Sequence, residues 1–191
     1  MKRQVLFIQG GGEGAHRADA KLVASLVKEL GSDYEVHFPP MPHEDTPEYA
    51  TWNRAIVEHL ARIGDNAILV GHSVGASVII RSLAENLAKQ KLAGVYLLAM
   101  PFIGERGWKI DGFLAHKNIG AKVSNVPIYL YHGRADEVVP FAHVDLYAEA
   151  IPQAVVRRLA GRNHQLNDDL SEVARDIRAD ESSRAPRGSR S

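Results

Sequence analysis

Short apolar runs alternate with longer amphipathic stretches along the chain. Val5 to Ile8 is one such run and ends at a glycine cluster, and Ala67 to Val70 is another and ends at Gly71. Apolar runs this short, bounded by glycine, are typical of strands buried on both faces. By the same reasoning we expect strands over residues 5–8, 34–38, 67–70, 94–99, 126–131 and 154–159.

Between these runs, apolar residues recur at helical spacing. Leu22 and Leu26 fall on one face of such a stretch, and Gly31 is a typical C-terminal stop. Thr46 followed by Pro47 is typical of an N-cap and a first helical position. We expect helices over residues 16–30, 47–63, 76–89, 141–150 and 167–178.

Strands that alternate with helices predict an α/β fold, in which a parallel sheet is covered by helices on both faces in a three-layer sandwich. A length of 191 residues fits one domain, which we place over residues 1–178. Residues 101–122 have no clean period and are expected to form a small lid-like insertion. Residues 179–191 are poor in apolar side chains and are expected to be disordered.

The composition narrows the class of protein. A net charge of +0 gives no sign of a nucleic acid partner or an anionic membrane surface. The absence of cysteine excludes disulfides, thiol nucleophiles and cysteine-ligated metals, and it fits a cytoplasmic location. No apolar stretch approaches the roughly 20 residues of a membrane span. We expect a small-molecule substrate and a monomer or homodimer.

One motif carries chemistry. Gly71-His72-Ser73-Val74-Gly75 matches G-x-S-x-G, directly after an apolar strand and before an apolar helix. In that context the serine occupies a strained strand-to-helix turn that holds its hydroxyl above the sheet. Ser73 is therefore the candidate nucleophile, although a strand–turn–helix corner with an incidental serine would have the same sequence.

A serine nucleophile needs a base and an acid that orients it. Asp136 follows the fifth expected strand, and His164 follows the sixth. The carboxyl ends of parallel strands share one edge of a sheet, so both are expected on the same edge as Ser73. The chain order Ser, Asp, His is the one that this kind of turn requires. We expect His164 to act as general base and Asp136 to fix its tautomer.

Other interpretations of these side chains remain open. Asp136 could simply cap the helix that follows, and Glu137 beside it could be the acid instead. His164 could be an exposed loop histidine. His72 is expected to support the turn, and His143, on an expected helix, to be solvated.

The backbone N–H of Val74 is expected to donate to an oxyanion, because it follows the nucleophile. A second donor should come from the glycine loop after the first strand, where we favour Gly11 over Gly12. This loop lacks the G-x-G-x-x-G spacing of nucleotide sites, and the chain has no H-E-x-x-H zinc motif. The polar residues 43–45 are interpreted as a solvated loop, so no metal is expected.

The sequence gives only weak signals for the residues that line the substrate pocket. Phe102 and Trp108, within the insertion, could cover the site with apolar surface, and His132 could line it. These rings could equally pack the segment onto the sheet.

At these residues the chain resembles the α/β-hydrolase superfamily. It is most similar to the compact serine hydrolases of the retinoblastoma-binding-protein type and their bacterial relatives. The likeness rests on the first strand with its glycine loop, the Gly-His-Ser-Val-Gly turn, the segment Gly-Arg-Ala-Asp-Glu-Val-Val-Pro and the late Asn-His.

The resemblance implies a six-stranded parallel sheet in the order 2-1-3-4-5-6, no cofactor, and two-step acyl transfer to water. One departure is Gln9, where many relatives have histidine before the first oxyanion glycine. It bears on the second oxyanion donor and not on the three catalytic side chains.

The expected function is therefore carboxylesterase-like hydrolysis of small esters by Ser73, Asp136 and His164. Two alternatives use the same sequence. One is an amidase or peptidase with the same three residues, and the other is a hydrolase fold that serves as a non-catalytic binding partner.

Overall fold

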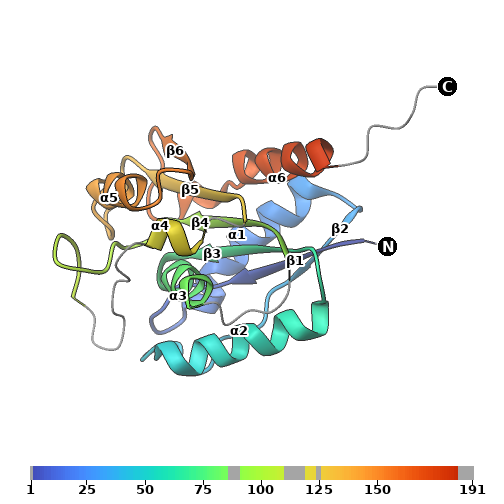
Figure 1. Ribbon diagram of the computed structural model, residues 1–191, viewed down its shortest axis with the longest axis horizontal. Coiled ribbons are helices and arrows are strands. Elements are labelled where there is room, and N and C mark those ends of the chain that lie inside the picture. Colours follow the sequence, from blue (N-terminus) through green and yellow to red (C-terminus); the bar gives the residue numbers. More distant parts are fainter. Residues whose placement is uncertain (1, 86–90, 110–118, 124–125, 185–191) are drawn as a thin grey trace.

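The computed structural model describes residues 2–85, 91–109, 119–123 and 126–184. Its strands form one sheet in the order β2-β1-β3-β4-β5-β6, and every neighbouring pair is parallel (Figure 1). The predicted α/β architecture and strand order are confirmed. The strands are β1 (Arg3–Ile8), β2 (Tyr34–His37), β3 (Ala67–His72), β4 (Leu92–Leu98), β5 (Ile128–Gly133) and β6 (Val155–Leu159). The helices are α1 (Ala15–Leu30), α2 (Tyr49–Ile63), α3 (Ser73–Ala84), α4 (Ile119–Lys122), α5 (Ala142–Ala150), the 3₁₀ turn η1 (Leu166–Asp168) and α6 (Ser171–Arg184).

The helices form two layers, one on each face of the sheet (Figure 1). Side chains alternate along a strand, so each strand supplies both layers. On β1, Val5 and Phe7 belong to the core beneath α1 and α6, whereas Leu6 and Ile8 belong to the core beneath α2, α3, α4 and α5. This two-sided burial explains why the inner strands are continuous apolar runs.

The central strand and the helix that follows it are the most buried elements. All six residues of β3 are buried, and most of α3 is buried too. The outer strands β2 and β6 are only partly covered. The junction between β3 and α3 is consequently held by packing from both layers.

Several expected helix boundaries were wrong, since α3 begins at Ser73 and not at residue 76, and α6 begins at Ser171 and not at residue 167. Helix α2 begins at Tyr49 with Glu48 as its N-cap, and not after Thr46. The backbone N–H of Thr46 instead donates to the carbonyl of His43 in a turn. Pro47 packs on the glycine loop, because its Cγ lies 2.9 Å from the position that a Cβ on Gly11 would occupy.

Helix α6 continues to Arg184, so residues 179–184 are helical and not disordered as expected. The physical reason lies in Asp180, whose carboxylate accepts hydrogen bonds from the hydroxyls of Tyr96 and Tyr129 at 3.0 and 2.7 Å. These bonds tie the last turns of the helix to the sheet. Residues 185–191 lie outside the described residues.

The expected insertion over residues 101–122 is described only at its ends. Residues 101–109 fold back on themselves, because the N–H of Trp108 donates to the carbonyl of Phe102 and the N–H of Gly104 donates to the carbonyl of Trp108. The segment ends in the single turn α4. Among the described helices, none is long and apolar enough to cross a bilayer.

Candidate active site

Four loops meet at the carboxyl edge of the sheet. Gly10 follows β1, Ser73 follows β3, Asp136 follows β5 and His164 follows β6. In open parallel sheets the ligand site lies beyond this edge. The structure therefore brings the sequence-predicted residues to the part of the fold where chemistry is expected.

Ser73 occupies a strained turn. Its φ is 50°, in the left-handed region that non-glycine residues rarely adopt, and it is 8% exposed. The turn depends on Gly75, because a Cβ there would lie 2.2 Å from the carbonyl oxygen of Gln9. The first turn of α3 can thus approach β1 only with glycine at this position, as the G-x-S-x-G motif requires.

Asp136 and His164 are paired. Nδ1 of His164 lies 3.0 Å from each carboxylate oxygen of Asp136, whose side chain is fully buried. The backbone N–H groups of Val138 and Val139 also donate to Asp136. Burial raises the pKa of the Asp136 carboxyl, but hydrogen bonds from His132 and His164 contribute to lowering it, and the net pKa lies below the usual range.

His132 contacts the same carboxylate. It is 1% exposed, and its Nε2 lies 3.0 Å from the carbonyl oxygen of Val139 and 3.2 Å from Oδ2 of Asp136. This histidine was expected to line the substrate pocket. In the structure its imidazole is directed to the Asp136 loop, where it helps to fix the orientation of the carboxylate.

The loops after β5 and β6 are in close contact. A Cβ on Gly133 would lie 2.1 Å from the carbonyl oxygen of Arg162, so only glycine allows the two chains to approach this closely. Ala135 donates its N–H to that same carbonyl, at 3.0 Å. Glu137, the alternative acid, accepts the backbone N–H of His164 at 3.2 Å. Of the two neighbouring carboxylates, Asp136 bonds the imidazole and Glu137 bonds the main chain.

The glycine loop after β1 is held by two acidic residues. The N–H of Gly10 donates to Oδ2 of Asp19 at 2.8 Å, and the N–H of Gly12 donates to the carbonyl of Glu44. The Glu44 carboxylate also accepts the N–H groups of Gly14 and His16, at 2.9 and 2.8 Å. Hydrogen bonds from this backbone lower the pKa of Glu44.

Residues 43–45 were expected to be a solvated loop, and His43 and Asp45 are exposed, whereas the partly exposed Glu44 also makes hydrogen bonds within the protein. Its carboxylate also accepts a hydrogen bond from Nε2 of Gln9, 2.6 Å away, while the side-chain oxygen of Gln9 accepts the N–H of Met41. Gln9 is fully buried. Gln9, which stands where many relatives have histidine, thus links the glycine loop to the segment that follows β2 by hydrogen bonds.

Sequence reasoning missed Asp19. This residue is 1% exposed and pairs with His72, whose Nδ1 lies 3.0 Å from Oδ2 of the carboxylate. The signal that could have found it is its position on α1, where Asp19 shares the buried face with Leu22 and Leu26. A carboxylate on the apolar face of a helix needs a buried partner.

The remaining pocket candidates pack on α5. The ring of Phe102 lies edge-on to Tyr147, and that of Trp108 lies edge-on to His143. His143 was expected to be solvated, but it is 6% exposed and its Nδ1 accepts the N–H of Phe102 at 3.0 Å. The described part of the insertion is thereby attached to the body of the fold.

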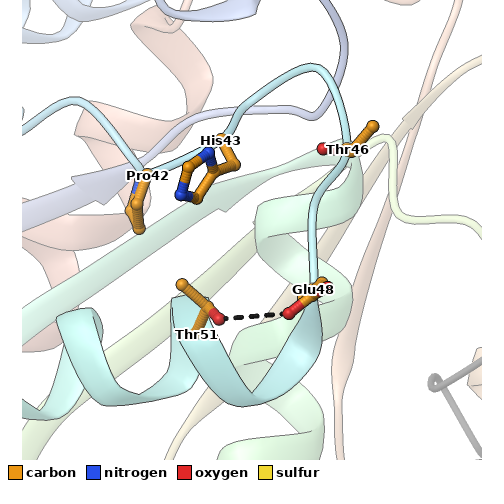
Figure 2. A pocket seen from close by; sticks show the side chains of 5 residues that line it. All are labelled: Pro42, His43, Thr46, Glu48 and Thr51. Atoms are coloured by element: carbon orange, nitrogen blue, oxygen red, sulfur yellow. Dashed lines mark hydrogen bonds between the residues drawn. The ribbon is translucent and has the colours of Figure 1, made fainter.

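A polar hollow lies beside the start of α2. Pro42, His43, Thr46, Glu48 and Thr51 line it, and Figure 2 shows the hydroxyl of Thr51 directed to the carboxylate of Glu48. The loop that forms one wall also carries the proline that covers Gly11. Within the described ranges, no group of three or more acidic or histidine side chains is arranged to hold a metal ion.

Solved structures with the same fold are numerous. The YdeN gene product of Bacillus subtilis is similar with a TM-score of 0.71 at 18% identity, covering 95% of this chain and all of that one. The esterase RhEst1 from Rhodococcus sp. ECU1013 is similar with a TM-score of 0.69 at 17% identity, covering 95% of this chain and 91% of that one. A serine hydrolase from Cycloclasticus has a TM-score of 0.71 at 15% identity, covering 93% of this chain and 88% of that one.

A curated relative matches part of the sequence. YfhR of Escherichia coli O157:H7, an uncharacterised protein, is 27% identical over 105 residues, which is 50% of this chain and 37% of that relative's length. The chain thus matches well under half of the relative's length.

A family model for serine hydrolases matches residues 20–169, which include the Ser73 turn, Asp136 and His164. Because this model matches more than half of the chain, the chain belongs to the serine hydrolase family. Its parallel sheet, in the order β2-β1-β3-β4-β5-β6, is that of the α/β-hydrolase fold.

Proposed function

We propose that this chain hydrolyses small carboxylic esters through an acyl-enzyme on Ser73, with His164 as general base and Asp136 as the acid that orients it. The observation that carries the proposal is the buried contact of Asp136 with Nδ1 of His164, at the sheet edge where Ser73 occupies its strained turn. A carboxylate on Nδ1 leaves Nε2 as the nitrogen that can accept the serine proton.

Nδ1 of His164 bonds Asp136, and among the hydrogen bonds of the described residues none joins the His164 ring to the Ser73 hydroxyl, so the two loops must bring these groups together for the proton to pass. The ring of His164 lies 4.8 Å, between centroids, from the ring of His72, which directly precedes Ser73. In the first step Nε2 takes the hydroxyl proton while Oγ attacks the ester carbon, and the imidazolium then protonates the departing alcohol. In the second step water repeats the sequence and releases the acid and Ser73.

The oxyanion would be bound by two backbone N–H groups. Gly10 and Gly12 already donate inside the protein, and among the described residues nothing accepts from Gly11. A Cβ on Gly11 would lie 3.2 Å from Cγ2 of Val74, so the two proposed donors are neighbours. The Val74 N–H lies in the first turn of α3, where helical N–H groups lack an intrahelical partner. Each such donor typically contributes about 10²–10³ in kcat.

Small esters are favoured over large lipids. The described part of the insertion packs on α5 through Phe102 and Trp108, and it is too short to form a separate cap domain. The similar Rhodococcus protein is an esterase by name, which favours an ester over an amide.

The test is a p-nitrophenyl ester series of increasing acyl length, run on the wild type and on Ser73→Ala. We expect activity that is highest on short acyl chains and absent in the variant. Labelling of the wild type by a fluorophosphonate, but not of Ser73→Ala, checks the nucleophile independently. Absence of both hydrolysis and labelling in the wild type would refute the proposal and favour a non-catalytic binding role.

A further inference from the structure

A buried ion pair lies next to the proposed catalytic groups, since His72 precedes Ser73 and contacts His164. The side chains of Asp19 and His72 are 1% and 2% exposed, and Nδ1 of His72 lies 3.0 Å from Oδ2 of Asp19. The other ring nitrogen of His72, Nε2, lies 3.1 Å from the carbonyl oxygen of His164. A carbonyl oxygen only accepts hydrogen bonds, so Nε2 of His72 must carry a proton.

Nδ1 of His72 carries a proton as well. The Asp19 carboxylate accepts the N–H of Gly10 at 2.8 Å and the side-chain amide of Gln165 at 3.1 Å. Burial raises the pKa of this carboxyl, but the charge of His72 and the hydrogen bonds that it accepts lower the pKa below its usual value, so the carboxyl is ionised and its contact with His72 requires an N–H on the ring. His72 is therefore an imidazolium. Burial alone would lower its pKa, but the charge of Asp19 raises it above the usual value.

The pair joins loops that are remote in sequence. Asp19 lies on α1 and holds Gly10 in the loop after β1, while His72 ends β3 and holds the loop after β6. His164 is consequently held by three hydrogen bonds. Its backbone N–H donates to Glu137, its ring donates to Asp136, and its carbonyl oxygen accepts from His72.

A contribution to folding stability does not by itself explain why this buried ion pair is present. Two charges buried together commonly contribute no more than well-packed apolar residues of the same volume, because their desolvation offsets their attraction. The pair does hold two backbone groups in place, because Asp19 accepts the N–H of Gly10 and His72 donates to the carbonyl of His164. A displacement of about 1 Å at such a site can lower a rate by about 100-fold.

We propose that Asp19 and the His72 imidazolium are positioning residues, which hold the backbone of His164 and the Gly10 end of the oxyanion loop in the geometry needed for hydrolysis. This inference rests on the proposed function. It assigns a role to the second residue of the Gly-His-Ser-Val-Gly motif, and it predicts that the bond from Nε2 to the His164 carbonyl matters more than the volume of the ring.

The test compares two substitutions of His72. In His72→Asn the amide can still reach Asp19 but not the carbonyl of His164, whereas in His72→Gln the longer side chain can still donate to that carbonyl. We expect kcat on a short p-nitrophenyl ester to fall about 10- to 100-fold in His72→Asn, with KM within about threefold, and to be within about fivefold of wild type in His72→Gln.

Asp176→Asn is the matched control. Asp176 is also a buried carboxylate in an ion pair, with Arg157, but on α6. We expect this variant to lose stability and keep its kcat. Equal rates in the wild type and both His72 variants would overturn the positioning role, and so would losses that simply follow the fall in melting temperature. An inactive, unlabelled wild type would instead refute the proposed function, and the positioning role with it.

A second measurement covers the case in which neither variant folds. The ¹⁵N shifts of His72 in the wild type at about pH 7 should show two protonated ring nitrogens. A neutral His72 ring there would overturn the inference.

Discussion

The carbonyl oxygen of His164 accepts a hydrogen bond from Nε2 of His72, 3.1 Å away, although 92 positions separate the two residues in sequence. The loop that carries the proposed base therefore rests on the residue that precedes the proposed nucleophile. The relative position of Ser73 and His164 is set by a direct contact between their loops, and not only by the sheet.

The first prediction concerns Asp136, the proposed acid that orients His164. Asp136→Asn should lower kcat by about 10⁴-fold, because an amide no longer holds the His164 tautomer that can accept a proton at Nε2. The side chain should still accept bonds from the N–H groups of Val138 and Val139, so circular dichroism should be unchanged. Steady-state kinetics on a short ester give the measurement.

Glu137→Gln is the control for that variant, since Glu137 bonds only the main chain of His164 among the catalytic groups. Its effect on kcat should be far smaller. A near-normal rate in Asp136→Asn with a large loss in Glu137→Gln would transfer the acid role to Glu137.

The second prediction concerns acid stability. The pKa values of Asp19 and Asp136 lie below the value of 3.8 expected of an unfolded aspartate. Each group therefore contributes stability that is present above that value and is lost as the pH falls through the lowered folded pKa. Urea denaturation at a series of pH values should show the free energy of unfolding decreasing below about pH 4. The decrease should be shallower in Asp136→Asn, and an identical pH profile would contradict this linkage.

The third prediction concerns the turn. Gly75→Ala places a methyl group 2.2 Å from the carbonyl oxygen of Gln9, which is backbone and cannot move aside cheaply. We expect a loss of about 3 kcal/mol, equivalent to roughly 10 °C in melting temperature, together with loss of activity.

Gly31→Ala is the matched comparison for Gly75→Ala. Gly31 ends α1 with φ 80°, and nothing lies within 4 Å of an added Cβ. Its substitution should cost about 1–3 kcal/mol from backbone strain alone and leave kcat intact, because its ψ of −170° places it in a region that only glycine readily adopts. If the two variants melted together with equal activity, close packing at the turn would not be the reason for Gly75.

The fourth prediction concerns the glycine loop. Glu44→Gln should weaken the bonds to the N–H groups of Gly14 and His16, because a neutral amide accepts less strongly than a carboxylate and has one acceptor oxygen in place of two. Hydrogen exchange at those two amides should accelerate, and kcat should fall while KM changes little. Unaltered exchange would mean that the loop is held by other contacts.

Much of the fold could be predicted from the sequence, because its signals are local. Runs such as Val5 to Ile8 report burial on both faces, and Gly-His-Ser-Val-Gly reports the turn that its own residues create. The order of Ser73, Asp136 and His164 after successive strands was likewise enough to expect all three on one edge, since parallel strands end together.

Tertiary structure decided the groups that act across the chain. The sequence analysis assigned no role to Asp19 and expected Glu44 to be solvated. The hydrogen-bond partners of Asp19 lie 9 to 146 positions away, and those of Glu44 lie 28 to 35 positions away. A hydrogen bond depends on separation in space, and no periodicity records which loops the sheet brings together. The residues proposed to react could therefore be predicted from the sequence, whereas the residues proposed to hold them in place became apparent only in the tertiary structure.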